Sequence, residues 1–576
     1  MAGGLLNLIA IGNQNVILNG NPSKTFWKST YKRYTNFGLQ NFRLDYEGLR
    51  ELQTSSESVF TFKVKRYAEL LMGTYLVINL PDIYSPILPP QDCTQGSSEG
   101  WSPYEFKWIK NLGAMIIGRI RFTIGGTLIQ EMSGYELLAL ANRDLSATQK
   151  SKWDQMTGNI AEINDPANAM GRINSYPNAV YTPTSSDTPG AEPSIRARQL
   201  HVPLPIWWGM TSQQAFPLVS LQYNELQIEV TLRPIQELFQ IRDVEDYDFN
   251  HPVIAPNFNL ATQQFYRFLQ TPPNPELEYS NKATSWNENI HLSCTYCFLS
   301  DDESVLFAKQ EQQYLIKELY HTWFQDIDIS DKAWLRNSSG MVCGWMIMFQ
   351  RSDVNLRNEW SNFTNWPYDY LPYDITPLAM LMDGSPCPEA YAFPFGSGEC
   401  ETILNIDAGT LGYGINPSGN ETGLFSTGSY RYENQKEILL TLGILFDGSV
   451  REEMRPAEIY SFQQPYLASN GYASSKLPGL YYYNFELDTS PFKLQPTGAI
   501  NLSKFSKIEI EFTTYTPVVD PNASYNIICD PETGVQIGVN KPSFQLYDYT
   551  YNLLVIEERY NVITFVAGNA ALMSAR

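Results

Sequence analysis

Apolar and polar residues alternate strictly in several short segments of this chain. In residues 59–65, Phe60 and Phe62 share one face of an extended segment, and the polar residues beside them share the other. The same alternation occurs in residues 228–233 and 508–513. Successive side chains of a β-strand point to opposite faces of a sheet, so this two-residue period is typical of a strand with one buried face. The alternation therefore predicts antiparallel sheets packed on a core.

Length and composition extend this prediction to a large protein rich in β-structure. The chain has 576 residues, more than one hydrophobic core usually supports, so two or more domains are expected. Aromatic residues make up 13% of the chain, which also contains 37 Gly and 36 Pro. Aromatic side chains suit a half-buried pleated surface, and Gly and Pro favour tight turns. This combination indicates many short strands joined by turns.

Two short repeats suggest that the chain contains two similar halves. The turn segment Ile124–Gly126 is similar to Phe446–Gly448. The segment Gln227–Val230 is similar to Lys507–Ile510, about half a chain length later.

Capping boxes mark the starts of two helices. In such a box a Ser and a Glu three residues later satisfy exposed amides at the helix N-terminus. Ser133 with Glu136 forms one candidate, and Ser300 with Glu303 forms the other. Residues 301–318, after the second box, contain good helix formers and neither Gly nor Pro. We expect a helix near the middle of the chain that links two domains.

A longer series of segments is spread in a fixed order over nearly the whole chain. They are Thr25–Phe37, Trp108–Met115, Ile124–Gly126, Tyr135–Glu136, Pro203–Trp208, Phe216–Glu225, Leu226–Val230, Asn358–Thr364, Phe462–Tyr466, Pro496–Ser503 and Tyr551–Ile556. In this order the series resembles the major capsid proteins of the nucleocytoplasmic large DNA viruses, the giant-virus double jelly-roll family. The closing residues 567–576 keep only the small-residue character of that family.

The resemblance implies an all-β fold of two tandem eight-stranded jelly rolls, with long loop insertions and a few short helices. Each jelly roll packs two four-stranded sheets. Long polar segments at residues 81–107, 171–196 and 405–430 fit such insertions, because loops of this length in compact domains are usually functional or disordered. The expected divisions are an N-terminal arm at 1–24, a first jelly roll at 25–300, a linker helix at 301–312, a second jelly roll at 313–566 and a C-terminal tail at 567–576.

The resemblance also implies a structural protein that is not an enzyme and needs no cofactor. It implies a homotrimeric, pseudo-hexagonal capsomer that tiles an icosahedral shell over an internal membrane. Neighbouring capsomers, minor capsid proteins and the membrane surface are the implied partners, and the virion, assembled in the host cytoplasm, is the implied location. One alternative is a minor or paralogous capsid protein of the same fold. Another, from a different class, is a large β-sandwich carbohydrate-active enzyme or lectin.

Charge is distributed unevenly along the chain. The net charge of −21 argues against direct nucleic-acid binding, because affinity for phosphates depends on cationic side chains. Residues 1–44 nevertheless contain five cations and no Asp or Glu. We interpret these cations as candidates for docking on acidic partners or anionic lipid at the inner layer of the shell, with an ordinary solvated arm as the alternative. They are Lys24, Lys28, Lys32, Arg33 and Arg43.

The sequence offers no convincing catalytic, cofactor or metal site. Cys294 and Cys297 form a C-x-x-C motif, but no second pair of ligands follows at a matching spacing, so a structural role is expected. The acids Asp301–Glu303 are explained more simply as charges at a helix N-terminus than as metal ligands. The four histidines lie at least 30 residues apart.

Cysteine use and sequons bear on compartment and modification. Seven Cys in so long a chain are typical of reduced thiols in a cytosol-like compartment. Asn-x-Ser/Thr sequons there are mostly chance matches. Asn420, in a Gly-rich loop, is the best placed for glycosylation. The sequons start at Asn337, Asn362, Asn420, Asn501 and Asn522.

Overall fold

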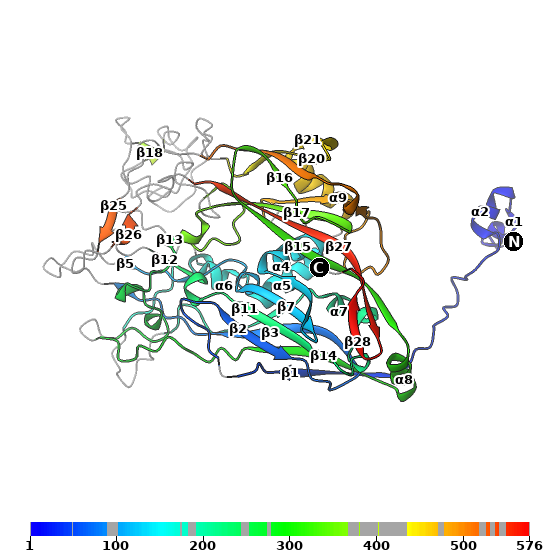
Figure 1. The fold of residues 1–576 in the computed structure, drawn as a ribbon, viewed down its shortest axis with the longest axis horizontal. Coiled ribbons are helices and arrows are strands. Elements are labelled where there is room, and N and C mark those ends of the chain that lie inside the picture. The colour runs from blue at the N-terminus through cyan, green and yellow to red at the C-terminus, as the bar shows by residue number, and fades with distance from the viewer. Residues whose placement is uncertain are drawn as a thin grey trace.

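The computed structural model contains two β-sandwiches that follow one another along the chain (Figure 1). In Figure 1 the first sandwich, in blue to green, lies below the second, in green to red. The structure describes all residues except 1, 49, 89–101, 173–174, 182–191, 243–252, 274–277, 367–378, 381–400, 403–434, 470–476, 518–525, 530–535, 541–548 and 575–576.

The first sandwich consists of two antiparallel sheets. One has the order β1-β14-β3, with both β9 and β10 paired to β3, and the other has the order β2-β11-β7-β8. The strands of the first sheet are β1 (Phe37–Leu44), β14 (His291–Leu299), β3 (Leu70–Leu80), β9 (Arg198–Pro203) and β10 (Phe216–Pro217). Those of the second are β2 (Ser58–Lys63), β11 (Leu226–Leu232), β7 (Ile117–Ile124) and β8 (Thr127–Met132).

The second sandwich repeats this arrangement. Its sheets have the orders β15-β27-β17-β22 and β16-β24-β20-β21. The first contains β15 (Gln312–Ile327), β27 (Tyr551–Val566), β17 (Met341–Arg351) and β22 (Leu480–Asn484), with β23 (Ile500–Asn501) on β17 and β28 (Asn569–Leu572) on β27. The second contains β16 (Ser330–Trp334), β24 (Ile508–Thr514), β20 (Leu439–Phe446) and β21 (Ser449–Pro456).

The order of pairing along the chain is the same in both halves, and it is that of a jelly roll. The two sequence repeats fall on equivalent elements. Ile124–Gly126 and Phe446–Gly448 form the β7–β8 and β20–β21 turns, and Gln227–Val230 and Lys507–Ile510 lie at strands β11 and β24. The predicted double jelly roll is therefore confirmed.

Alternation places the core side chains as predicted. Phe60 and Phe62 of β2 pair with Val230 and Ile228 of β11, and all four side chains are fully buried. The polar residues between them face away from this core. Such cross-strand apolar pairs fix the register, because a slip by one residue would expose the whole set.

The remaining elements are short. The helices are α1 (Leu5–Ile9), α2 (Val16–Asn19), α3 (Leu112–Met115), α4 (Gly134–Asp144), α5 (Ala147–Thr157), α6 (Ala161–Asn164), α7 (Trp207–Met210), α8 (Asp301–Lys309) and α9 (Gln464–Ala468). Further strands are β4 (Ile87–Leu88), β5 (Ser102–Pro103), β6 (Lys107–Trp108), β12 (Phe239–Arg242), β13 (Val253–Ile254), β18 (Ala379–Met380), β19 (Glu401–Thr402), β25 (Asn526–Cys529) and β26 (Gln536–Asn540). Among the described residues, no helix has the length and apolarity needed to cross a bilayer.

Three element boundaries differ from the predicted divisions. The linker helix α8 ends at Lys309 rather than 312, because Gln312 already pairs with Phe565 of β27 and this pairing overrides the helix propensity of residues 312–318. The first strand begins only at Phe37, so the exposed arm continues beyond residue 24. The tail 567–576 contains β28, which pairs with β27.

Candidate functional site

The junction between the two jelly rolls is fastened by the segment Asn358–Thr364. The buried amide of Asn358 donates hydrogen bonds to the backbone carbonyls of Gln236 and Phe239, both at 2.8 Å. The indole nitrogen of Trp360 donates to the carbonyl of Glu237 at 3.0 Å. The sequence singled out this segment, but its role in joining the halves was not predicted, because its partners lie more than a hundred residues away.

A buried cluster of charges lies at the same junction, where α4 faces β15 and β27 (Figure 1). Nη2 of Arg143 lies 2.8 Å from Oδ2 of Asp144 and 2.9 Å from Oε1 of Glu558. Nζ of Lys317 lies 2.7 Å from Oε1 of Glu486. The Arg143, Asp144 and Glu558 side chains are at most 3% exposed. One Arg therefore neutralises two acids, one from each half of the chain.

Protonation of the cluster follows from burial and its neighbours. Burial alone would raise the pKa of Glu558, but the charges of Arg143 and Lys317 outweigh it and lower that pKa below its ordinary value. Burial raises the pKa of Glu486, against the opposing charge of Lys317. The Arg143–Glu558 pair is therefore ionised, which requires that both partners stay together in the dry interior.

A second ionic contact across the junction involves the predicted capping box of α4. Glu136 accepts a hydrogen bond from the Ser133 amide at 2.8 Å and also binds the Ser133 hydroxyl. Its other oxygen lies 2.7 Å from Nδ1 of His321 on β15. Burial would raise the pKa of Glu136, but the bonds from His321 and Ser133 lower it below its ordinary value. The carboxylate of Glu136, which caps α4 in the first jelly roll, thus also binds a side chain of the second jelly roll.

The variant Glu136→Gln should lower the free energy of unfolding by about 1.5–3 kcal/mol at pH 7, because charge-assisted hydrogen bonds are lost. The folded-state pKa lies below the ordinary 4.5, so the contribution of the carboxylate is complete above that pH and disappears as the pH falls through the folded value. Chemical unfolding at pH 7 and at a series of pH values below 4.5 measures the free energy of unfolding of the variant and of the unchanged chain. Glu192→Gln, at a highly exposed ion pair, serves as the control. If the difference in free energy of unfolding between the variant and the unchanged chain stays constant as the pH falls, the ionised Glu136 carboxylate is not the source of the stabilisation.

Aromatic rings complete the junction. Phe565 of β27 packs edge-on against Phe216 of the first jelly roll, with ring centroids 5.2 Å apart, and against Tyr314 of β15 at 5.8 Å. The ring centroids of Trp207 and Tyr314 lie 5.3 Å apart. Aromatic side chains from both halves therefore pack in one apolar cluster.

The C-x-x-C cysteines are buried thiols in strand β14. Cys294 packs in the core of the first jelly roll, whereas Cys297 packs separately with Leu70 and Ala215. Burial raises the pKa of the Cys294 thiol to about 12, which disfavours a reactive thiolate. These contacts support the structural interpretation.

The other candidate ligands do not converge in the part of the chain that the structure describes. There, no group of three or more His, Cys, Asp or Glu side chains could hold a metal ion. Asp301–Glu303 occupy the first turn of α8, as predicted, but the Ser300 side chain makes no capping hydrogen bond, so the second capping box is wrong. His251 lies outside the described residues.

The N-terminal arm stands away from the two jelly rolls (Figure 1). Helices α1 and α2 have no buried residues, and the apolar side chains of Ile17 and Leu18 are almost fully exposed. Trp27 is 94% exposed. Exposed apolar side chains in this number are typical of a surface that binds a partner.

Four of the five candidate docking cations belong to this arm, namely Lys24, Lys28, Lys32 and Arg33. The fifth, Arg43, lies in strand β1, where its Nε is 2.6 Å from Oδ1 of Asp45. It is therefore part of the sheet and not of the arm. Asn420 lies outside the described residues.

Family models match both halves of the chain. The model for the major capsid protein N-terminus matches residues 25–260. The model for the large eukaryotic DNA virus major capsid protein matches residues 346–562. One matched range thus lies in the first jelly roll and the other in the second.

Individual proteins agree with these models. The major capsid protein of Phaeocystis pouchetii virus is 24% identical over 96% of this chain and 98% of its own length. That of Chrysochromulina ericina virus is 28% identical over 62% of this chain and 58% of its own length. The structure of the Faustovirus major capsid protein matches with a TM-score of 0.57 at 14% identity, covering 98% of this chain and 99% of that one, which supports the fold. The chain thus belongs to the major capsid proteins of the large eukaryotic DNA viruses, a family of structural proteins and not of enzymes.

Proposed function

We propose that three copies of this chain form a pseudo-hexagonal capsomer and that such capsomers tile an icosahedral shell over an internal membrane. The observation that carries this proposal is the pair of topologically equivalent jelly rolls held in one unit by a buried junction. Three such chains in a ring present six similar barrels, so a threefold particle has a nearly sixfold outline. A rigid junction keeps this outline constant from copy to copy.

Membership of the family makes the chain a component of the virion capsid that assembles with neighbouring capsid subunits. The proposed trimer contacts are heterologous and need large interfaces, above about 2,000 Å² each, for a permanent assembly. The buried, free thiols of Cys294, Cys297 and Cys343 favour folding in a reducing compartment, in line with assembly in the host cytoplasm.

Negative-stain imaging of the purified chain tests the outline of the particle. Threefold particles with a hexagonal edge and six density lobes are expected. Isolated two-lobed particles that bind saccharides would instead favour the lectin or carbohydrate-active alternative. A minor or paralogous capsid protein would give the expected outline but a low copy number in purified virions.

We further propose that the arm, residues 2–36, docks on the inner layer of the shell, against minor capsid proteins or the membrane surface. Two features support this: the apolar side chains of α1 and α2 are exposed, and the following segment carries four cations and no acid. Such a short segment cannot bury a core of its own, so in this proposal a partner covers its apolar side chains. Glycosylation of Asn420 also stays a proposal, and peptide mass mapping of the virion protein would test it.

Removal of residues 1–20 should leave the mass of the oligomer and its melting temperature nearly unchanged while impairing shell assembly, because none of the residues in α1 and α2 is buried in the body. Replacing Lys24, Lys28 and Lys32 by Glu should weaken docking on anionic vesicles. The difference from the unchanged chain should decrease with added salt, because salt shortens the range over which exposed charges interact, which is about 8 Å at physiological ionic strength. Light scattering and vesicle co-sedimentation measure these effects. Loss of the oligomer on truncation would show that the arm is part of the folded jelly-roll body, which would contradict the proposed docking role.

A further inference from the structure

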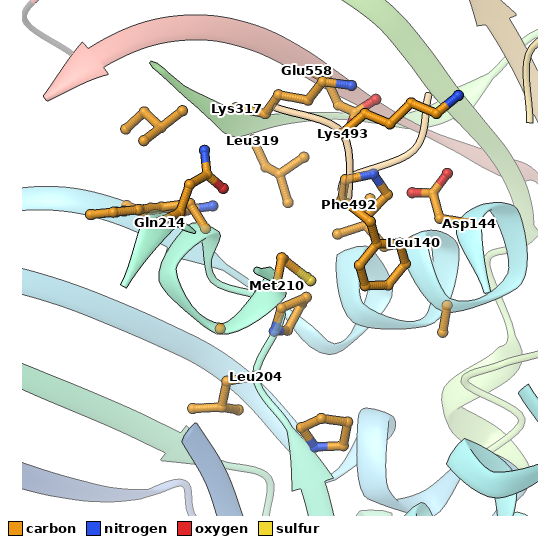
Figure 2. Close-up of a pocket in the computed structure, with 18 of the residues that line it drawn as sticks. Leu140, Asp144, Leu204, Met210, Gln214, Lys317, Leu319, Phe492, Lys493 and Glu558 are labelled. Carbon is orange, nitrogen blue, oxygen red and sulfur yellow. The ribbon is translucent and has the colours of Figure 1, made fainter. Parts of the chain in front are cut away.

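Helix α4 of the first jelly roll lies against the sheet that contains β15 and β27 of the second. Tyr135 of α4 packs edge-on against Trp323 of β15, with ring centroids 5.4 Å apart. Figure 2 shows Leu140 and Asp144 of α4 and Glu558 of β27 around a cavity between the two jelly rolls. Because both jelly rolls cover α4, every residue of this helix except Leu140 is buried.

The outer face of that sheet is apolar. Met346 and Met348 of β17 pair with Ile556 and Leu554 of β27, and all four side chains are buried in the apolar cluster of the first jelly roll. Their neighbours in sequence point the other way, into the core of the second jelly roll. A sheet with two buried faces needs a covering element on its outer side, and here the first jelly roll supplies it.

The equivalence of the two jelly rolls gives the chain a second surface of each kind. Strands β1 and β14 are the equivalents of β15 and β27. Helix α4 follows the hairpin β7–β8, and after the equivalent hairpin β20–β21 comes a helical segment at residues 459–468, which consists of a π-helical turn and α9. We call the outer side of β1 and β14 the sheet face, and the outer side of residues 459–468 with β21 the helical face.

The sheet face is apolar and exposed. Leu39 of β1 pairs with Cys297 of β14, and Phe37 pairs with Leu299. Cys297 and Leu299 pack with Leu70 of β3 in a small apolar cluster that is separate from the main core. Phe37 and Leu39 are 52% and 53% exposed. Exposed apolar side chains beside such a cluster are typical of a binding surface.

The helical face is apolar and exposed as well. Tyr460 and Ala468 are buried in their own jelly roll, whereas Phe462, Tyr466 and Leu467 are 54%, 86% and 66% exposed. The equivalent helix α4 is covered on both sides. Residues 459–468 therefore resemble α4 without the jelly roll that covers it.

Strand β21 extends the helical face. It is the edge strand of its sheet, is exposed over nearly its whole length, and carries the exposed side chains of Val450 and Met454. Its equivalent in the first jelly roll, β8, contacts β15 of the second. Proteins usually cover or pair an edge strand with apolar side chains, because it otherwise promotes aggregation.

We propose that the helical face of one chain packs on the sheet face of a second copy of this chain. The contact that α4 makes within a chain is then repeated between chains. The two faces lie on opposite sides of the molecule, with α9 and β21 at the top of Figure 1 and β1 at the bottom, so one chain cannot join them but two copies can. Contacts between unlike surfaces form a ring when the rotation closes. The inference rests on the proposed trimer and identifies the surfaces that close it.

Two variants of the full-length chain test the two faces separately. Phe37→Glu with Leu39→Glu alters the sheet face, and Tyr466→Glu with Leu467→Glu alters the helical face. Each variant should run as a folded monomer in light scattering, because a carboxylate buried without a partner weakens a contact about tenfold or more. Met170→Glu with Tyr223→Glu is the control of equal charge, at positions 77% and 76% exposed on neither face, and should stay trimeric.

Mixing the two variants tests the direction of the contact. The first variant keeps its helical face and the second keeps its sheet face, so the mixture contains one intact contact but cannot close a ring. Complexes of two chains are expected, with twice the mass of 65.5 kDa. A contact between like faces would instead let each variant dimerise alone.

Radical footprinting of the unmodified trimer tests the contact without any substitution, and it decides the matter if a variant does not fold. The ring of Tyr466 should be protected from oxidation, whereas the ring of Tyr223 should react as an exposed side chain. Phe37 should also be protected, and this protection should persist when residues 1–20 are removed, because a second copy and not the arm covers it.

The outcomes separate this inference from the proposed trimer. A monomeric unmodified chain would contradict both. A trimeric unmodified chain would leave the trimer standing and overturn the inference if both face variants also form trimers, if the mixture stays monomeric, or if Tyr466 reacts as fast as Tyr223. Loss of Phe37 protection on truncation would assign the sheet face to the arm and overturn the inference in the same way.

Discussion

Replacing Arg143 by Met is expected to lower the free energy of unfolding by about 3–5 kcal/mol, because it leaves Asp144 and Glu558 buried beside each other without their shared cation. Methionine is also unbranched and flexible, so the loss reflects charge more than a cavity. Chemical unfolding followed by circular dichroism measures the effect. The two jelly rolls should also separate more readily, since the Arg143–Glu558 pair joins one half to the other.

Arg196→Met is the matched control. Arg196 pairs with Glu192, but both side chains are largely exposed, at 78% and 80%. Exposed pairs contribute between about 0 and 1 kcal/mol, so little change is expected. Equal losses in the two variants would show that the junction cluster is not the source of the stability.

Truncation of Phe565 to Ala is expected to cost about 3–5 kcal/mol, because its ring is 1% exposed and the neighbouring strands can close the cavity only in part. The ring packs against Phe216 of the first jelly roll and Tyr314 of β15, so the cost should appear at the junction as well as in overall stability. Limited proteolysis in the linker around α8 should therefore become faster.

Trp27→Ala in the arm is the control for this change. The Trp27 ring is 94% exposed, so its removal should alter the free energy of unfolding by no more than about 0.5 kcal/mol. A comparable loss in both variants would mean that the arm packs on the body and would contradict the proposed inner-layer role.

The fold followed from the sequence where local patterns agree with tertiary structure. The alternation around Phe60 and Phe62 identified a core strand, and the repeat of Gln227–Val230 at Lys507–Ile510 marked the same strand in both jelly rolls. The pattern failed at residues 312–318, where helix formers belong to β15. Pairing with the distant β27 decides that segment, and no local signal carries this information.

The junction was beyond sequence reasoning for the same reason. Glu136 was recognised as a capping residue, but nothing near it in sequence indicates its contact with His321. Arg143 and Glu558 are 415 residues apart and each resembles an ordinary surface charge until the fold buries both. The arm was easier to recognise, because its run of cations without acids is a local feature, although Arg43 at the end of that run proved to belong to strand β1.

Light scattering on the purified chain at micromolar concentration tests the capsomer most directly. A permanent homotrimer predicts a mass three times the 65.5 kDa of one chain, unchanged on dilution. A mass of 65.5 kDa under these conditions would contradict it.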